Sequence, residues 1–90
     1  MNKTVLPSVA ALVAFESAAR HGSFTRAAAE LNLTQGAISR QIRQLESQLG
    51  TVLFKRIRQR VTLSDAGRSY LTDVRQTLEA LEGATQVSTE

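Results

Sequence analysis

The spacing of apolar residues predicts two helices near the N-terminus. The first covers about residues 9–20, where apolar side chains recur three or four positions apart, at Leu12, Phe15 and Ala19. It is expected to end at Gly22, which suits the left-handed conformation that commonly follows a helix. The second helix is short, about residues 25–31, and Ser23 is its expected N-cap.

A tight turn then leads into a longer third helix. Asn32 tolerates positive φ and is expected to end the second helix, with apolar Leu33 filling the corner. The third helix covers about residues 35–49, with Thr34 as its N-cap and Gly50 as its stop. Its expected core face holds five apolar residues: Ala37, Ile38, Ile42, Leu45 and Leu49. The opposite face carries no acidic residue in the first eleven positions of this helix.

Two apolar runs after the third helix are too short for helices. Residues 52–54 and 61–63 are expected to form two strands around a basic turn at residues 55–60. Helices followed by one short hairpin predict a mainly α fold of the winged helix-turn-helix class, with a three-helix core and a short β-hairpin wing.

A long C-terminal helix completes the expected fold. It starts after Ser64, its expected N-cap, and runs to about Leu81 or beyond. Gly83 and the polar residues 85–90 are expected to fray. One side of the helix is apolar and would be exposed in an isolated monomer, so we expect a homodimer interface at Tyr70, Leu71, Val74, Leu78 and Leu81.

Composition narrows the possible functions. The chain has 90 residues, no cysteine and one histidine, which fits a single domain without disulfides or a cysteine-bound zinc. No apolar run approaches the length of a membrane span, so we expect a cytoplasmic protein with no membrane contact. Residues 20–60 carry eight Lys/Arg against two Glu, whereas residues 61–90 carry two Arg against five Asp/Glu. This asymmetry indicates either one surface that meets a polyanion or merely an unevenly charged surface.

The polar face of the third helix favours nucleic acid as the polyanion. In a helix-turn-helix, the second helix of the motif enters the major groove with its N-terminal residues against the bases. Here those residues include Gln35, Ser39 and Arg40, and Gln pairs well with adenine and Arg with guanine. We therefore expect these side chains to contact bases, with Arg40 reading a guanine.

The basic hairpin gives independent support. Four cations in six residues would repel one another in a sheet that lacked an anionic partner. Lys55, Arg58 and Arg60 are expected to contact the DNA backbone or a narrow minor groove, with Arg58 nearest the tip. Arg56 has a second interpretation, as a side chain tethered inside the fold.

Several linked motifs resemble one family. They are Gly22-Ser23-Phe24-Thr25-Arg26-Ala27-Ala28, Leu31-Asn32-Leu33-Thr34-Gln35-Gly36-Ala37-Ile38-Ser39-Arg40-Gln41-Ile42, Leu45-Glu46, Leu49-Gly50, Leu53-Phe54 and Leu63-Ser64-Asp65-Ala66-Gly67. Over about residues 6–80 the chain resembles the N-terminal domain of bacterial LysR-type transcriptional regulators. The resemblance implies a winged helix-turn-helix whose fourth helix pairs with that of a second subunit.

The resemblance also assigns contacts to double-stranded DNA. Base contacts would be made at Gln35, Gly36, Ser39 and Arg40. Backbone contacts would be made by the wing and by Ser23, Thr25, Thr34 and Arg43. Many family members have proline where this chain has Gly36, which puts an apolar contact to a thymine methyl group in doubt there.

The expected organisation is a DNA-binding domain at residues 1–63 and a linker and dimerisation helix at residues 64–90. The family's effector domain would follow, so we expect this chain to be part of a longer protein that regulates transcription. Two-fold symmetry implies an inverted-repeat site, and RNA polymerase is an expected partner of the full-length protein. No cofactor or metal is expected.

Two other classes of function are weaker. An enzyme lacks support, because His21 is the only histidine and no nucleophile–base pair suggests itself; His21 is expected to end the first helix. A pure dimerisation module would explain the last helix but not the basic hairpin. RNA binding would call for exposed aromatic residues, whereas those present look structural: Phe15, Phe24, Phe54 and Tyr70.

Overall fold

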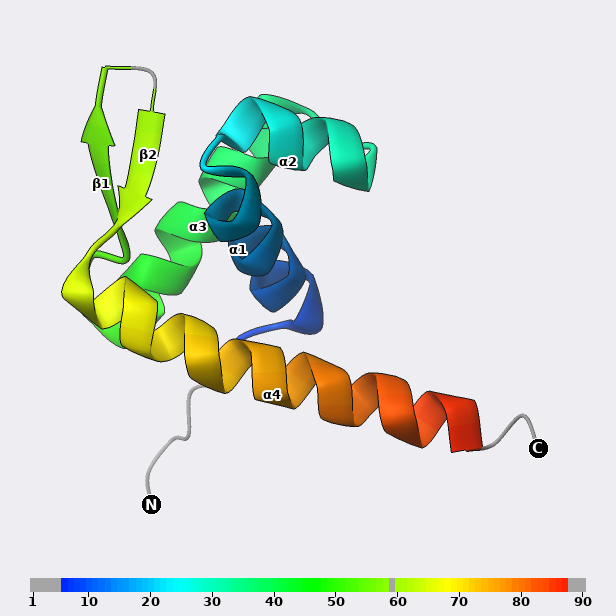
Figure 1. Ribbon diagram of the computed structural model, residues 1–90. Coiled ribbons are helices and arrows are strands. Elements are labelled where there is room, and N and C mark those ends of the chain that lie inside the picture. The colour runs from blue at the N-terminus through cyan, green and yellow to red at the C-terminus, as the bar shows by residue number, and fades with distance from the viewer. Residues whose placement is uncertain (1–5, 59, 88–90) are drawn as a thin grey trace.

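The computed structural model describes residues 6–58 and 60–87, except for the side chains of residues 86 and 87. Its elements are α1 (Val9–His21), α2 (Phe24–Leu31), α3 (Gln35–Leu49), β1 (Phe54–Ile57), β2 (Arg60–Leu63) and α4 (Asp65–Val87). The first three helices form a bundle above α4, and the two strands project beside them as an antiparallel hairpin (Figure 1). The predicted winged helix-turn-helix class is confirmed.

Local sequence sets the ends of the first three helices. The Ser23 and Thr34 hydroxyls accept hydrogen bonds from the backbone N–H groups of Arg26 and Ala37, so both predicted N-caps are confirmed. Gly22, Asn32 and Gly50 each adopt the left-handed conformation predicted for helix ends, with φ between 58° and 71°.

The α2–α3 turn differs from the expectation in one respect. Leu33 does not fill the corner, because its side chain remains 47% exposed. The backbone closes this turn instead, since the Leu33 N–H donates to the Ala28 carbonyl at 2.9 Å. Left-handed Asn32 is therefore sufficient to redirect the chain without an apolar plug.

Phe15 of α1 lies at the centre of the core. Its ring centroid is 5.5 Å from that of Phe54 and 5.4 Å from that of Tyr70, and Phe24 meets Phe54 edge to face. Three of the predicted inward residues of α3 are fully buried beside them, namely Ile38, Ile42 and Leu45. Leu49 was expected in this core but is exposed, at the last residue of α3.

The turn of the hairpin is shorter than the predicted residues 55–60, and the first strand begins at Phe54 instead of residue 52. The strands pair in register from Phe54 with Leu63 to Ile57 with Arg60, so most of the predicted basic turn belongs to the strands. We call residues 54–63 the wing. The Glu46 carboxylate of α3 accepts the backbone N–H groups of Leu53 and Phe54 at 2.8 and 3.3 Å and fixes the start of the wing.

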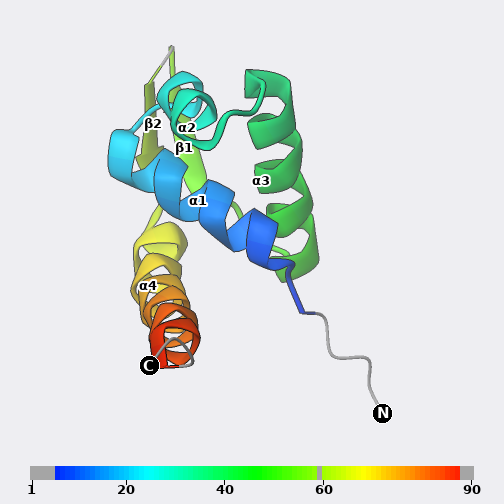
Figure 2. The same ribbon diagram turned by 90° about the vertical axis from the view of Figure 1, so that its right-hand side faces the viewer.

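Ser64 joins the wing to α4. Its hydroxyl accepts the Gly67 N–H at 3.0 Å, as predicted for an N-cap, and donates to the Val52 carbonyl at 2.7 Å. Helix α4 then crosses beneath α1 (Figures 1 and 2) and buries Val74 against the core. It continues through Gly83 to Val87, so the expected fraying from Gly83 is wrong for the residues that the structure describes.

Candidate nucleic-acid interface

Helix α3, the expected DNA-recognition helix, and the wing reach the same end of the molecule. Helix α3 begins, β1 ends and β2 begins at the end farthest from α4 (Figure 2). Gln35, Gly36 and Arg40 are exposed there on the first two turns of α3, and Ser39 is half-buried. The structure therefore presents all four predicted base-contacting residues on an accessible helix surface.

Several predicted contact residues also hydrogen-bond within the protein. The Thr25 hydroxyl donates to Gln35 Oε1 at 3.3 Å and so links the first turns of α2 and α3. The Arg43 guanidinium donates to Ser39 Oγ at 3.5 Å. Both bonds are exposed and at the long end of the accepted range, so a stronger partner would displace them at small cost.

The predicted backbone contacts fall into two groups. Ser23 and Thr34 accept backbone N–H groups as N-caps, so each has a structural role before it meets any ligand. Thr25, Arg43, Lys55, Arg58 and Arg60 are exposed and reach solvent. Lys55 and Arg60 lie on the strands, whereas Arg58 occupies the turn that joins them, as predicted.

Arg56 packs against the core surface. Its guanidinium carbon lies 4.9 Å from the centroid of the Phe24 ring, which is cation–π geometry. This supports the second interpretation, in which the residue is tethered. The side chain nevertheless remains exposed, so its N–H groups stay accessible to an anion.

A depression of about 510 Å³ separates the wing from the start of the recognition helix. Its polar lining consists of the hydroxyl groups of Ser23 and Thr25, the amide of Gln35 and the guanidinium groups of Arg56 and Arg58. Phe24 and Val61 complete the lining with apolar side chains. Hydroxyl and guanidinium donors are typical of sites that hold a DNA phosphate.

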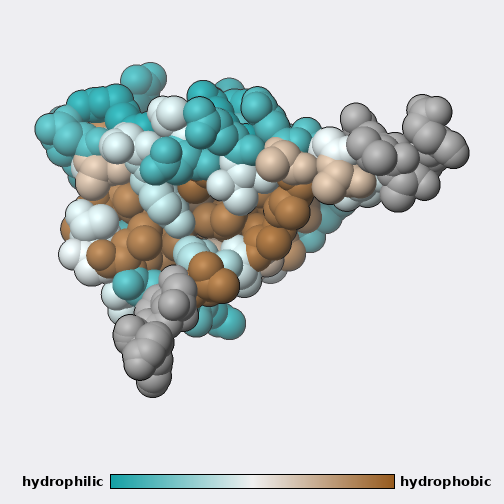
Figure 3. Space-filling view, turned by 90° about the horizontal axis from the view of Figure 1, so that it is seen from below, coloured by the Kyte–Doolittle hydropathy of each residue, from teal (hydrophilic) through white to brown (hydrophobic). Residues whose placement is uncertain are grey.

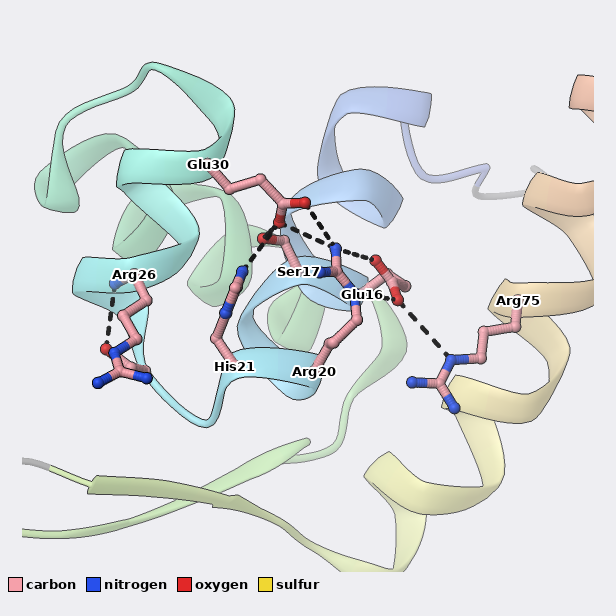
Figure 4. Close-up of polar contacts among 8 residues, drawn as sticks. Glu16, Ser17, Arg20, His21, Arg26, Glu30 and Arg75 are labelled. Atoms are coloured by element: carbon pink, nitrogen blue, oxygen red, sulfur yellow. Dashed lines mark hydrogen bonds and ion pairs between the residues drawn. The ribbon is translucent and has the colours of Figure 1, made fainter.

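Arg20 belongs to a different surface, although the charge count from the sequence placed it in the basic segment. Its guanidinium bonds to the carboxylates of Glu16 and Glu30 at 2.9–3.0 Å (Figure 4). These bonds, first that to Glu16, raise the already high pKa of Arg20. Its charge is therefore compensated by α1 and α2, not available to a ligand.

Glu30 is the centre of this network. Hydrogen bonds from Ser17, at 2.5 Å, and from Arg20 lower the pKa of its carboxyl group to about 2, with a smaller contribution from His21. His21 ends α1 as predicted, and its Nε2 lies 3.1 Å from Glu30 Oε1. Arg75 of α4 approaches the same cluster through Glu16 at 3.8 Å. The network ties α1 to both α2 and α4.

The family model for bacterial regulatory helix-turn-helix proteins of the lysR family matches residues 9–68. The chain belongs to the LysR family. It is the DNA-binding domain of a LysR-type transcriptional regulator, as the sequence motifs indicated. Its winged helix-turn-helix is thus the family's fold, with the family's motifs at the start of α2, through α3 and at the start of α4.

Known relatives of the LysR-family domain are regulators of transcription. The glycine cleavage system transcriptional activator of Escherichia coli K12 is 47% identical over 81 residues, which are 90% of this chain and 27% of that protein. The RuBisCO operon transcriptional regulator of Allochromatium vinosum is 42% identical over 91 aligned positions, covering 90% of this chain and 30% of that protein. The chain thus spans less than a third of the length of these relatives.

A solved complex with DNA shares the fold. The CbnR DNA-binding domain in its DNA complex matches with a TM-score of 0.85 and 33% identity, covering 91% of this chain and 94% of that one. Corynebacterium glutamicum OxyR, in its C206 mutant, matches with a TM-score of 0.91 and 30% identity, over 97% of this chain and 28% of that one.

The apolar side of α4 is less free than the sequence suggested. Val74 is only 2% exposed and packs inside the monomer, so the expectation that it would be uncovered is wrong. Tyr70, Leu71 and Leu78 are half-buried against the same core, and Leu81 is 46% exposed. Apolar residues still gather on the lower face of the molecule (Figure 3). Of the five predicted interface residues, Leu81 is the most accessible.

None of the described helices combines the length and the hydropathy of a membrane span.

Proposed function

We propose that this LysR-type domain reads a specific sequence in double-stranded DNA by placing α3 in the major groove and the wing against the adjacent backbone or minor groove. One observation carries the proposal. Within residues 6–58 and 60–85, ion pairs involve Arg20, His21, Arg68 and Arg75, but none of the basic residues of α3 or the wing. A set of uncompensated cations beside an exposed polar helix suits a polyanion.

The place of each residue in the fold decides whether we assign it a base contact or a backbone contact. Base contacts are assigned to the first two turns of α3, at Gln35, Gly36, Ser39 and Arg40. Backbone contacts are assigned to the N-cap regions, the third turn of α3 and the wing, at Ser23, Thr25, Thr34, Arg43, Lys55, Arg58 and Arg60. The complex of the related CbnR domain with DNA supports this assignment by analogy of fold.

The working form is proposed to be a homodimer joined through α4 that binds an inverted repeat. The half-buried and exposed residues of α4 would meet the second copy, namely Tyr70, Leu71, Leu78 and Leu81. The relatives are longer than this chain, which supports an effector domain beyond residues 64–90 in the full-length protein. A contact of that protein with RNA polymerase and a cytoplasmic location are further parts of the proposal.

The test begins with selection of binding sites from random duplex DNA by the purified domain. The Arg40→Ala variant should then bind the selected site more weakly by about 1–3 kcal/mol and lose its preference at one position. Arg40 is exposed, so the variant should fold like the parent, as circular dichroism can check.

Arg43→Ala is the matched control on the same helix. Its assigned phosphate contact predicts a similar loss on selected and mixed-sequence DNA. If Arg40→Ala also weakened both DNAs equally, Arg40 would not read a base. If selection enriched no sequence at all, sequence-specific recognition would be ruled out.

A further inference from the structure

A second depression continues from the first along β2 of the wing. It has a volume of about 520 Å³ and shares Ser23 and Val61 with the first depression. Beyond these it leads away from α3 to a cluster of basic groups; its lining is His21, Gly22, Ser23, Arg26, Arg60, Val61 and Thr62. No residue of α3 takes part in it.

Arg26 and Arg60 line this surface from two different elements. Arg26 lies on the first turn of α2, whereas Arg60 begins β2. Both side chains are exposed, and neither makes an ion pair with the described residues. Arg26 also points away from the Glu30 network, and the bond drawn to it comes from its backbone N–H (Figure 4).

The acidic residue that contacts this lining does not cancel its charge. Glu30 reaches His21, but the same carboxylate is already paired with Arg20. Two guanidinium groups therefore line the depression without a carboxylate of their own. Guanidinium groups bind phosphate oxygens through paired N–H donors, so the arrangement fits a phosphate group.

We propose that Arg26 and Arg60 bind a phosphate of the DNA backbone outside the segment covered by α3. The site rests on the proposed function, because the depression continues the one beside the recognition helix. The surface is open, which gives a free phosphate ion little enclosure, whereas a duplex is held there by its other contacts as well. The site would lengthen the footprint of each subunit without reading bases.

Arg26→Gln tests this site in the full 90-residue chain. The probe is a mixed-sequence DNA duplex long enough for two half-sites, titrated over a range of salt concentrations. Loss of one phosphate contact should lower the slope of log affinity against log salt by about 0.9. Arg60→Gln should give a similar drop from the other side of the depression.

Arg75→Gln is the matched control, because it removes the same charge from α4 and should keep the slope of the parent. A parent-like slope in Arg26→Gln would overturn the shared phosphate site while leaving DNA binding intact, even if Arg60→Gln lowered the slope, because Arg60 already has a backbone contact in the proposed function. A parent that showed no salt-dependent binding to duplex DNA would instead overturn the proposed function.

Inorganic phosphate at constant ionic strength separates the two sources of phosphate. It should leave the thermal midpoint of the parent unchanged. A rise in that midpoint that disappears in Arg26→Gln would assign the site to a free anion and overturn the DNA assignment.

Discussion

At the scale of single residues, Gly67 shows how closely α4 approaches the segment that leads into the wing. A Cβ atom at this position would lie 2.2 Å from the backbone carbonyl oxygen of Leu53, a distance that no real Cβ contact reaches. This segment cannot easily move away, because the Leu53 N–H donates to the Glu46 carboxylate and the Val52 carbonyl accepts from the Ser64 hydroxyl. The absence of a side chain at Gly67 is therefore a condition for the joint between wing and α4.

We expect Gly67→Ala to lower the free energy of unfolding by at least about 1–3 kcal/mol, because an overpacked core must shift its backbone. Gly83→Ala is the control on the same helix. Apart from the backbone of its own helix and its chain neighbours, no described atom lies within 4 Å of its added methyl group, so the substitution should raise stability by up to about 1 kcal/mol. Urea unfolding of both variants measures the difference, and a neutral Gly67→Ala would contradict the close contact.

Glu30 gives the domain a pH dependence at the acidic end. Its pKa is lowered from 4.5 to about 2 by hydrogen bonds from Ser17, Arg20 and His21. A lowered pKa in the folded state contributes stability that is fully present above pH 4.5 and is lost as the pH falls through about 2. Glu30→Gln should therefore flatten the fall in stability across this window.

Unfolding followed from pH 5 to about 2 checks this expectation. Glu79→Gln serves as the control, because Glu79 is exposed on α4 and makes no hydrogen bond or ion pair with the described residues. Equal pH profiles for the parent and Glu30→Gln would show that the Glu30 bonds do not persist in solution.

Residue chemistry at the helix ends could be predicted from the sequence, whereas exposure could not. The Ser23 and Thr34 hydroxyls accept backbone N–H groups three residues further on, and Asn32 acts through its own left-handed backbone, so the neighbouring residues suffice to assign them. The exposure of Leu33 and Leu49 and the burial of Val74 depend on which element covers each residue. Apolar periodicity identifies the face of a helix but not the extent of its neighbour.

At the scale of elements, the wing was the hardest part to predict. Only Phe54 of β1 is buried in the core, so all three residues after it in this strand are exposed and no apolar alternation marks the strand. The sequence therefore suggested a wide basic turn where the backbone is paired up to Ile57 and Arg60. Glu46, which anchors the wing, was also missed as a site residue, although it is the only acidic residue of α3.

Two substitutions of Arg58, at the wing tip, separate the effect of backbone strain on stability from the effect of charge on DNA binding. Arg58 has φ of 60°, where most side chains are strained and glycine is not. Arg58→Gly and Arg58→Ala remove the same charge, so each should lower the salt slope of DNA binding by about 0.9. Arg58→Gly should be more stable than Arg58→Ala by about 1 kcal/mol, because only alanine retains the strain.

Thermal unfolding and salt titration of the two variants give both answers. If the two were equally stable, the left-handed tip would not persist in solution. If both kept the salt slope of the parent, Arg58 would make no phosphate contact, whatever its backbone conformation.

At the scale of the whole molecule, charge and apolar surface occupy different ends. The start of α3 and the tip of the wing lie at the end farthest from α4 (Figure 2), and apolar residues gather on the lower face of the molecule (Figure 3). From the basic middle and acidic end of the sequence we infer either a surface that meets a polyanion or an unevenly charged surface, not where that surface lies in the fold. The sequence also could not show that Arg20 is compensated by Glu16 and Glu30, because that pairing depends on how α1 packs against α2.

This division leaves Leu81 as the sharpest test of dimerisation. Leu78→Asp would damage the monomer's own core, since Leu78 packs against it, whereas Leu81 is 46% exposed and should tolerate a charge in the monomer. We expect Leu81→Asp to fold normally but to weaken self-association in sedimentation, because a carboxylate would enter an apolar interface. Binding to an inverted repeat should fall more than binding to a single half-site, since only the repeat requires both subunits.

Leu33→Asp, at 47% exposure in the α2–α3 turn, is the matched control for self-association and should leave it unchanged. A parent that stayed monomeric at high concentration and on DNA would exclude the dimer, and parent-like association of Leu81→Asp would exclude this part of α4 as its interface.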